Sequence, residues 1–195
     1  MNSITMQESV SDFFDDEFIE EIITKNEYYE IRSENAISLI KGHFWEKGER
    51  YKFLDIYLDD LYSENYSLQY DIDINNVIKK YKDIDILFIE SFAHQMPTSV
   101  KHLFNNLSHI RTLSIQGYLK QKECRNLESF YHLEVLRLRM WNARDIDFTK
   151  CKNLKRCMII MSKHNSTKDQ IQVSREYIKK LESDGSDINF ELIID

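Results

Sequence analysis

Apolar residues between positions 81 and 161 recur in one spacing. Four copies place apolar side chains at positions i, i+3, i+6 and i+8. The second members stand at 84, 110, 133 and 154, so successive copies lie 26, 23 and 21 residues apart. The copies are Tyr81/Ile84/Leu87/Ile89, Leu107/Ile110/Leu113/Ile115, Phe130/Leu133/Leu136/Leu138 and Cys151/Leu154/Cys157/Ile159. Such a period is typical of stacked repeats, each made of a strand and a return segment.

The last two members of each copy are two positions apart, which is the period of a β-strand. Leu113 and Ile115 therefore point to one face of a sheet, and the residues between them point to the other. One unit cannot bury its apolar face alone, so neighbouring units must stack. We expect parallel strands, adjacent in chain order, near 86–90, 112–116, 135–139 and 156–160.

This signature resembles the leucine-rich repeat family, whose core reads Leu-x-x-Leu-x-Leu-x-x-Asn/Cys-x-Leu. The resemblance covers roughly residues 81–162. It departs at the Asn/Cys position, whose side chain in the family satisfies backbone groups in the turn; here stand Phe92, Tyr118, Trp141 and Ser162. The resemblance implies an α/β fold, a short solenoid with a parallel sheet that holds a partner on its concave face. The alternative is an ordinary α/β domain with evenly spaced strands.

Residues 1–80 predict a helical N-terminal cap over one end of the sheet. An amphipathic pattern predicts a helix over 5–24, and Ser33 and Gly42 are suited to begin and end a second helix. Residues 51–62 fit either a helix or a degenerate first repeat carried by Phe53, Ile56 and Leu58. Strict alternation over 68–74 predicts a strand.

Residues 163–195 predict a C-terminal cap of one helix and one strand. Thr167 and Gln170 form a capping box for a helix to about Ser183, which Gly185 ends. Ile188, Phe190, Leu192 and Ile194 then alternate as a closing strand. Within the repeat region 81–162 we expect a short helix over 97–105 and an extended return over 143–150.

Composition favours one globular domain spanning 1–195, because 42% of its 195 residues are apolar and 30% charged. The N-terminus lacks the basic and apolar regions of a secretory signal, and no stretch reaches the ~18 apolar residues of a membrane span. We therefore expect a cytoplasmic protein without membrane contact. Its three cysteines are expected to be reduced, with Cys151 and Cys157 in the core.

Catalytic chemistry finds no support in the sequence. The six histidines form no metal-ligand spacing, the four glycines stand alone, and no nucleophile motif is present. We expect no enzyme activity, no catalytic residue, no metal site and no cofactor, and the sequence indicates no small-molecule substrate.

Binding of a protein partner is the leading hypothesis. By strand alternation, the sheet face opposite the core carries apolar side chains together with three arginines, a mixture typical of interaction hot spots. The predicted partner-binding residues are Phe88, Glu90, Ser114, Gln116, Arg137, Arg139, Arg156 and Met158. The alternative is that the apolar members pack beneath a cap. The arginines need carboxylates, from a partner or from the acidic N-terminal half.

Charge is unevenly distributed and supports two alternatives. Residues 1–90 carry 21 acidic and 9 basic residues, whereas 91–195 carry 12 and 17. One alternative is an immunity protein that neutralises a basic bacterial toxin through Asp55, Asp59, Asp60, Glu64, Asp71 and Asp73. The other is nucleic-acid binding through the basic segment 101–163. That segment could equally pair with the acidic half, within one molecule or in a homodimer.

Overall fold

The computed structural model describes residues 25–32, 38–47, 51–60, 80–81, 83–95, 109–118, 127–128 and 130–195. The helices predicted over 5–24 and 97–105 and the strand predicted over 68–74 lie outside these residues. Within the described part the fold is mixed α/β, so the predicted class is confirmed.

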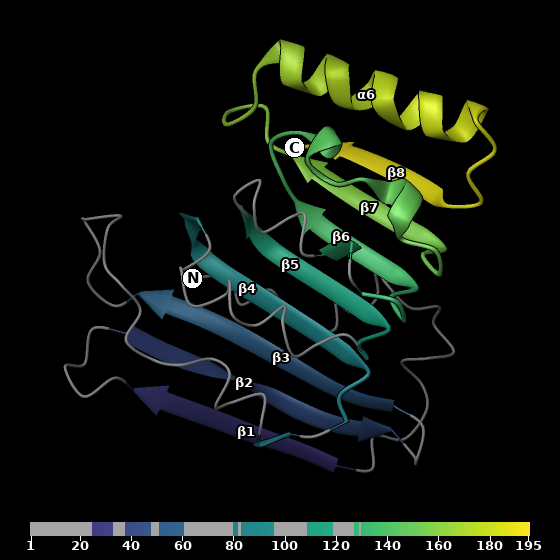
Figure 1. Ribbon diagram of the computed structural model, residues 1–195. Coiled ribbons are helices and arrows are strands. Elements are labelled where there is room, and N and C mark those ends of the chain that lie inside the picture. Colours follow the sequence, from purple (N-terminus) through teal and green to yellow (C-terminus); the bar gives the residue numbers. More distant parts are fainter. Residues whose placement is uncertain are drawn as a thin grey trace.

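One sheet of eight strands dominates the described chain, with the strands side by side in chain order (Figure 1). Strands β3 to β8 are parallel, whereas β1 and β2 run antiparallel to their neighbours. The four strands predicted from the apolar spacing correspond to β4–β7, parallel and adjacent as expected. The strand bounds are Lys25–Arg32, Ser38–Lys47, Tyr51–Asp60, Ile86–Gln95, Thr112–Tyr118, Val135–Arg139, Arg156–Met161 and Asn189–Ile194.

Two apolar rows cross the six parallel strands and build the core. The register aligns Leu54, Leu87, Leu113, Leu136, Cys157 and Phe190 in the first row. The second row consists of Ile56, Ile89, Ile115, Leu138, Ile159 and Leu192. Every described member of the four signature copies is buried, and Leu107 lies outside the described residues.

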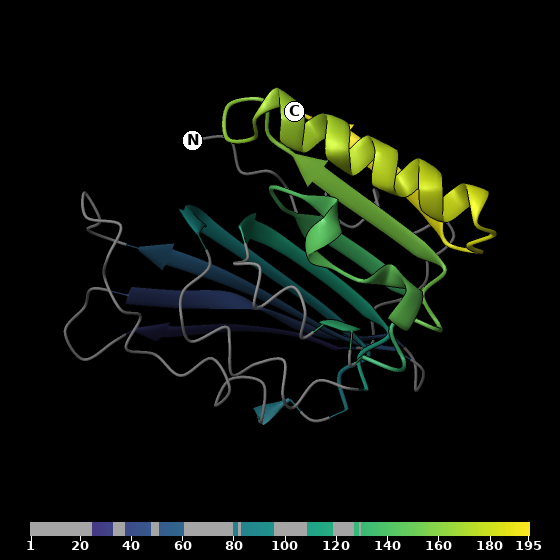
Figure 2. The same cartoon turned by 45° about the horizontal axis from the view of Figure 1, so that its top comes forward.

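The core face is covered near its C-terminal end by two short 3-10 turns and one helix. The turns are η3 (Ala143–Asp145) and η4 (Phe148–Lys150), and the helix is α6 (Lys168–Ser183). Figure 2 shows all three on the same side of the sheet, and Phe148 and Ile178 join the core cluster. The extended return predicted here is wrong, because side chains at Asn142 and Asp147 cap the two turns.

Helix α6 begins and ends as the sequence predicts. Thr167 Oγ1 accepts a hydrogen bond from the Gln170 backbone N–H, and the Gln170 side chain accepts one from the Thr167 N–H, completing the capping box. Gly185 follows the helix with a φ of 85°, a left-handed conformation that glycine adopts without steric cost. Strand β8 then pairs with β7 as the predicted closing strand.

The predicted helix from Ser33 to Gly42 is wrong, since β2 occupies Ser38–Lys47. Gly42 lies in mid-strand, opposite Tyr29 of β1 and Ile56 of β3. A spacing of four residues, as between Ile40 and Phe44, fits one face of a helix and one face of a strand equally well. Of the segment 51–62, the described residues Tyr51–Asp60 form a strand, and its residues in the apolar rows are Leu54 and Ile56.

Candidate functional site

The sheet face opposite the core divides into a closed and an open section. Among the predicted binding residues, Phe88 is 6% exposed, Ser114 2% and Met158 6%, so these three side chains are buried. Arg137, Arg139 and Arg156 are half-buried, as is Gln116. Glu90 pairs with Gln116 in the strand register. On this face, solvent therefore reaches Gln116 and the three arginines, but not Phe88 of β4, Ser114 of β5 or Met158 of β7.

The open section carries the three arginines, together with carboxylates that form ion pairs with Arg139 and Arg156. We use "arginine section" for seven solvent-accessible residues of this face at the C-terminal end of the sheet: Val135, Arg137, Arg139, Arg156, Glu191, Ile193 and Asp195. Met158 and Ile160 of β7 lie on the same face but are buried. Arg139 Nη2 lies 2.7 Å from Asp195 Oδ2, and Arg156 Nη2 lies 3.6 Å from Glu191 Oε2. Arg137 lies between Ser114 and Met158 in the register.

The source of these carboxylates differs from both sources expected from the sequence. For Arg139 and Arg156 they are Asp195 and Glu191, at the C-terminal end of the chain. The signal was present in the sequence: because Phe190 and Leu192 face the core, Glu191 must share the arginines' face. Arg139 and Arg156 each have further guanidinium N–H donors beyond the nitrogen in the ion pair.

The alternative acidic surface is only partly described. Asp55 is 3% exposed, in register with Phe88, so its side chain lies within the closed section. Asp59 and Asp60 pair through their backbones with Leu39 and Ser38 of β2. Glu64, Asp71 and Asp73 lie outside the described residues. Burial of Asp55 removes one member from any solvent-facing acidic surface.

A row of alternating charge runs along the strand starts, and the sequence reasoning missed it. This "charge ladder" consists of Lys52, Asp85, Arg111, Glu134 and Lys155, each hydrogen-bonded to the next through backbone N–H and C=O groups at 2.8–2.9 Å. Glu134 accepts from Arg111 Nε at 2.8 Å and from Lys155 Nζ at 2.6 Å. The hydrogen bond from Lys155 has the largest effect in lowering the pKa of Glu134, and the one from Arg111 lowers it further. The sequence did hold a signal for it: in each signature copy a charged residue directly follows the second apolar position, namely Asp85, Arg111, Glu134 and Lys155.

Ion pairing also engages basic residues of the segment 101–163. Besides the arginines above and the charge ladder, Lys150 Nζ lies 3.0 Å from Glu128 Oε2 and 3.3 Å from Asp147 Oδ2. The basic segment is therefore interleaved with its own carboxylates. Within the described residues of this segment, carboxylates thus stand beside several of the basic groups that a phosphate backbone would need.

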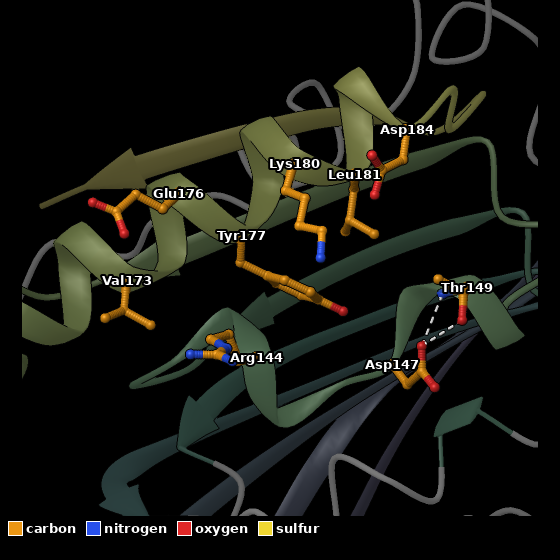
Figure 3. Close-up of a pocket in the computed structure, with 9 residues that line it drawn as sticks. All are labelled: Arg144, Asp147, Thr149, Val173, Glu176, Tyr177, Lys180, Leu181 and Asp184. Atoms are coloured by element: carbon orange, nitrogen blue, oxygen red, sulfur yellow. Dashed lines mark hydrogen bonds between the residues drawn. The ribbon is translucent and has the colours of Figure 1, made fainter.

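A groove of about 370 Å³ lies between α6 and the two 3-10 turns. Figure 3 shows Tyr177 pointing from α6 toward the turns, between Arg144 and Thr149. Tyr177 Oη donates to the Ile146 carbonyl at 3.0 Å, and burial raises the pKa of Tyr177. Asp147 accepts from Thr149 Oγ1 at 2.5 Å, which lowers the pKa of Asp147. The lining mixes both charge signs and its hydroxyl groups are already used in these contacts.

The two described cysteines lie in the core. Cys151 and Cys157 are free and buried, as predicted. Burial raises the pKa of Cys151 to about 11 and that of Cys157 well above its usual value, so both remain unreactive thiols. Among these residues no group of three or more His, Cys, Asp or Glu side chains could hold a metal ion.

None of the helices in the described part combines the length and apolar character that crossing a bilayer requires. No protein-family model, curated protein or solved structure matches this chain.

Proposed function

We propose that this chain is a non-catalytic protein-interaction module that binds a partner protein through the arginine section. The observation that carries the proposal is the division of the non-core face. Asp55, Phe88, Ser114 and Met158 are buried, whereas Arg137, Arg139 and Arg156 keep part of their surface exposed on the adjacent strands β6 and β7. Arginine on a rigid strand is a favourable anchor, because little freedom is lost when a partner binds.

The module is built, in our proposal, on divergent leucine-rich repeats that form a short solenoid. Both apolar rows continue without interruption from β3 to β8, which supports a larger number of repeats than the four signature copies. At the position of the family's Asn/Cys, the Ser162 hydroxyl accepts a hydrogen bond from the His164 backbone N–H at 3.2 Å. This hydrogen bond satisfies a backbone N–H group in the turn after the strand, which is also the role of the Asn/Cys side chain in the family.

A partner that presents carboxylates beside apolar groups would fit the arginine section. Val135 and Ile193 supply half-buried apolar area, and the guanidinium groups of Arg139 and Arg156 supply donors for pairing with carboxylates. Nucleic acid fits less well, because Glu191 and Asp195 stand among the arginines and would repel phosphate.

The test is capture of a partner from extract of the native cell with the immobilised chain. Wild-type protein is compared with the double variant Arg137→Ala/Arg139→Ala and with the control Arg175→Ala/Lys179→Ala. The control removes the same charge from exposed positions on α6. We expect a protein captured by the wild type and the control but lost with the arginine variant. Equal capture by all three would refute the proposed surface, and a captured toxin would identify the module as an immunity protein.

A further inference from the structure

Strand β8 ends the described sheet, and its core-facing side is less covered than that of the strands before it. In the first apolar row Leu87, Leu113 and Leu136 are fully buried, whereas Phe190 is half-buried. The second row behaves in the same way, since Leu192 is half-buried, and so is Ile194 beyond it on β8. The apolar rows therefore reach solvent at this edge.

The backbone of β8 presents hydrogen-bonding groups on this edge. Asn189 N–H donates to the Lys155 carbonyl at 2.8 Å and Asp195 N–H to the Met161 carbonyl at 3.1 Å, so odd-numbered residues bond toward β7. In a regular strand the groups of the intervening residues then point away from β7. These are Phe190, Leu192 and Ile194, and no described strand pairs with them. The strand also lacks lysine and proline, which commonly protect edges.

We propose that a second copy of this chain pairs with β8 in antiparallel orientation, with the two-fold axis at Leu192. Each Leu192 then lies opposite its symmetry mate, and Phe190 lies opposite Ile194 of the other copy. All three residues present their N–H and C=O groups outward, so each opposed pair exchanges both hydrogen bonds. A two-fold arrangement of this kind uses the same surface on both copies.

Charge selects this register over its neighbours. A two-fold axis at Glu191 would place the two Glu191 carboxylates directly opposite each other. An axis at Ile193 would place Glu191 opposite Asp195. With the axis at Leu192, Glu191 lies opposite Ile193, and no like charges meet across the pair. Of the three registers centred on residues 191, 192 and 193, only the one centred on Leu192 brings no like charges together, so the strand can pair there with its own copy.

Sedimentation velocity over a rising protein concentration tests the pairing. For the wild-type chain we expect the mass to rise from 23.5 kDa toward twice that value. Ile193→Glu places a carboxylate opposite Glu191 of the other copy, and Ile193→Lys places an ammonium group there. We expect the dissociation constant to be roughly tenfold or more higher for the glutamate variant than for the lysine variant, because two such pairs form per dimer.

Circular dichroism of both variants checks that the fold is intact. A cross-linking experiment tests the register without relying on the stability of either variant. Residues 191 and 193 of opposed copies would form a non-hydrogen-bonded pair with a Cα separation of ~4.5 Å, within disulfide range. Mixed Glu191→Cys and Ile193→Cys chains should therefore cross-link more than either chain alone. A wild-type chain that sediments as a monomer throughout, equal dimerisation of the two Ile193 variants, or no preference for the mixed cross-link would overturn the proposal.

Discussion

Arg139 on β6 and Asp195 after β8 form an ion pair of 2.7 Å, although 56 positions separate them in the sequence. Strand β7 lies between them in the sheet, where Ile160 pairs with both Arg139 and Ile193. The backbone of Asp195 is fixed by its N–H bond to Met161 and by a bond from Lys163 N–H to its carbonyl. The end of β8 thereby holds an arginine of the proposed binding surface in place.

Replacing Asp195 by Asn should change stability little. The side chains of Arg139 and Asp195 are 29% and 40% exposed, so water and salt screen their attraction. We expect the free energy of unfolding to change by roughly 0–1 kcal/mol, measured by urea titration. Partner affinity should fall because Arg139 loses its fixed position. A stability loss above ~2 kcal/mol would instead assign Asp195 a mainly structural role.

Replacing Glu134 by Gln should destabilise the fold by about 1 kcal/mol at neutral pH, because Arg111 and Lys155 lose the carboxylate charge that they share. The pKa of Glu134 is lowered in the folded protein. Its stabilising contribution is therefore fully present above the ordinary value of 4.5 and is lost as pH falls through the folded pKa.

The stability difference between wild type and this variant should accordingly shrink below pH 4.5. Urea titrations at several pH values measure it. Glu182→Gln on the exposed side of α6 serves as control. A difference that stays constant between neutral and acidic pH would show that the carboxylate charge contributes nothing.

Leu136 and its neighbour Val135 provide a matched test of the sheet faces. Leu136 is fully buried in the first apolar row, whereas Val135 is half-buried on the opposite face. Leu136→Ala should cost about 2–5 kcal/mol through lost burial and a cavity, and Leu136→Asp should unfold the chain. Val135→Ala should cost clearly less than Leu136→Ala. Equal losses in thermal unfolding would contradict the assignment of the core face.

The parallel strands and α6 could be predicted from the sequence because their signals are local and redundant. The spacing of Leu136 and Leu138 fits a strand alone, and Thr167 with Gln170 forms a capping box that needs no distant residue. By contrast, Ile40 and Phe44 are compatible with both periods. This segment forms a strand because β2 pairs with β1 and β3, which is a long-range interaction.

The candidate site was only partly predictable for a related reason. Alternation places Phe88, Ser114 and Arg137 on one face, and the register confirms that they are aligned. It does not give the burial of each side chain, which depends on the whole chain. The pairs of Arg139 with Asp195 and of Arg156 with Glu191 require β8 to lie beside β7, and the arginine spacing alone does not supply that.

Gly185 tests the end of α6. At φ 85° an added Cβ atom would meet no other atom within 4 Å, so only backbone conformation opposes a side chain there. Gly185→Ala should cost roughly 1–2 kcal/mol, and Gly185→Asn less, since asparagine tolerates the left-handed region better. Thermal unfolding of both variants measures the order. A reversed order would show that the turn changes its conformation in the variants.

The most direct test of the account is the affinity of the captured partner for wild-type chain and for Arg137→Ala/Arg139→Ala, measured by calorimetry. Thermal unfolding of both proteins runs alongside, with Arg175→Ala/Lys179→Ala as the matched control. We predict a loss of at least ~2 kcal/mol in binding free energy for the arginine variant, with little change in its melting temperature and none in the control's affinity. An arginine variant that is fully stable and binds its partner with unaltered affinity would contradict the central claim.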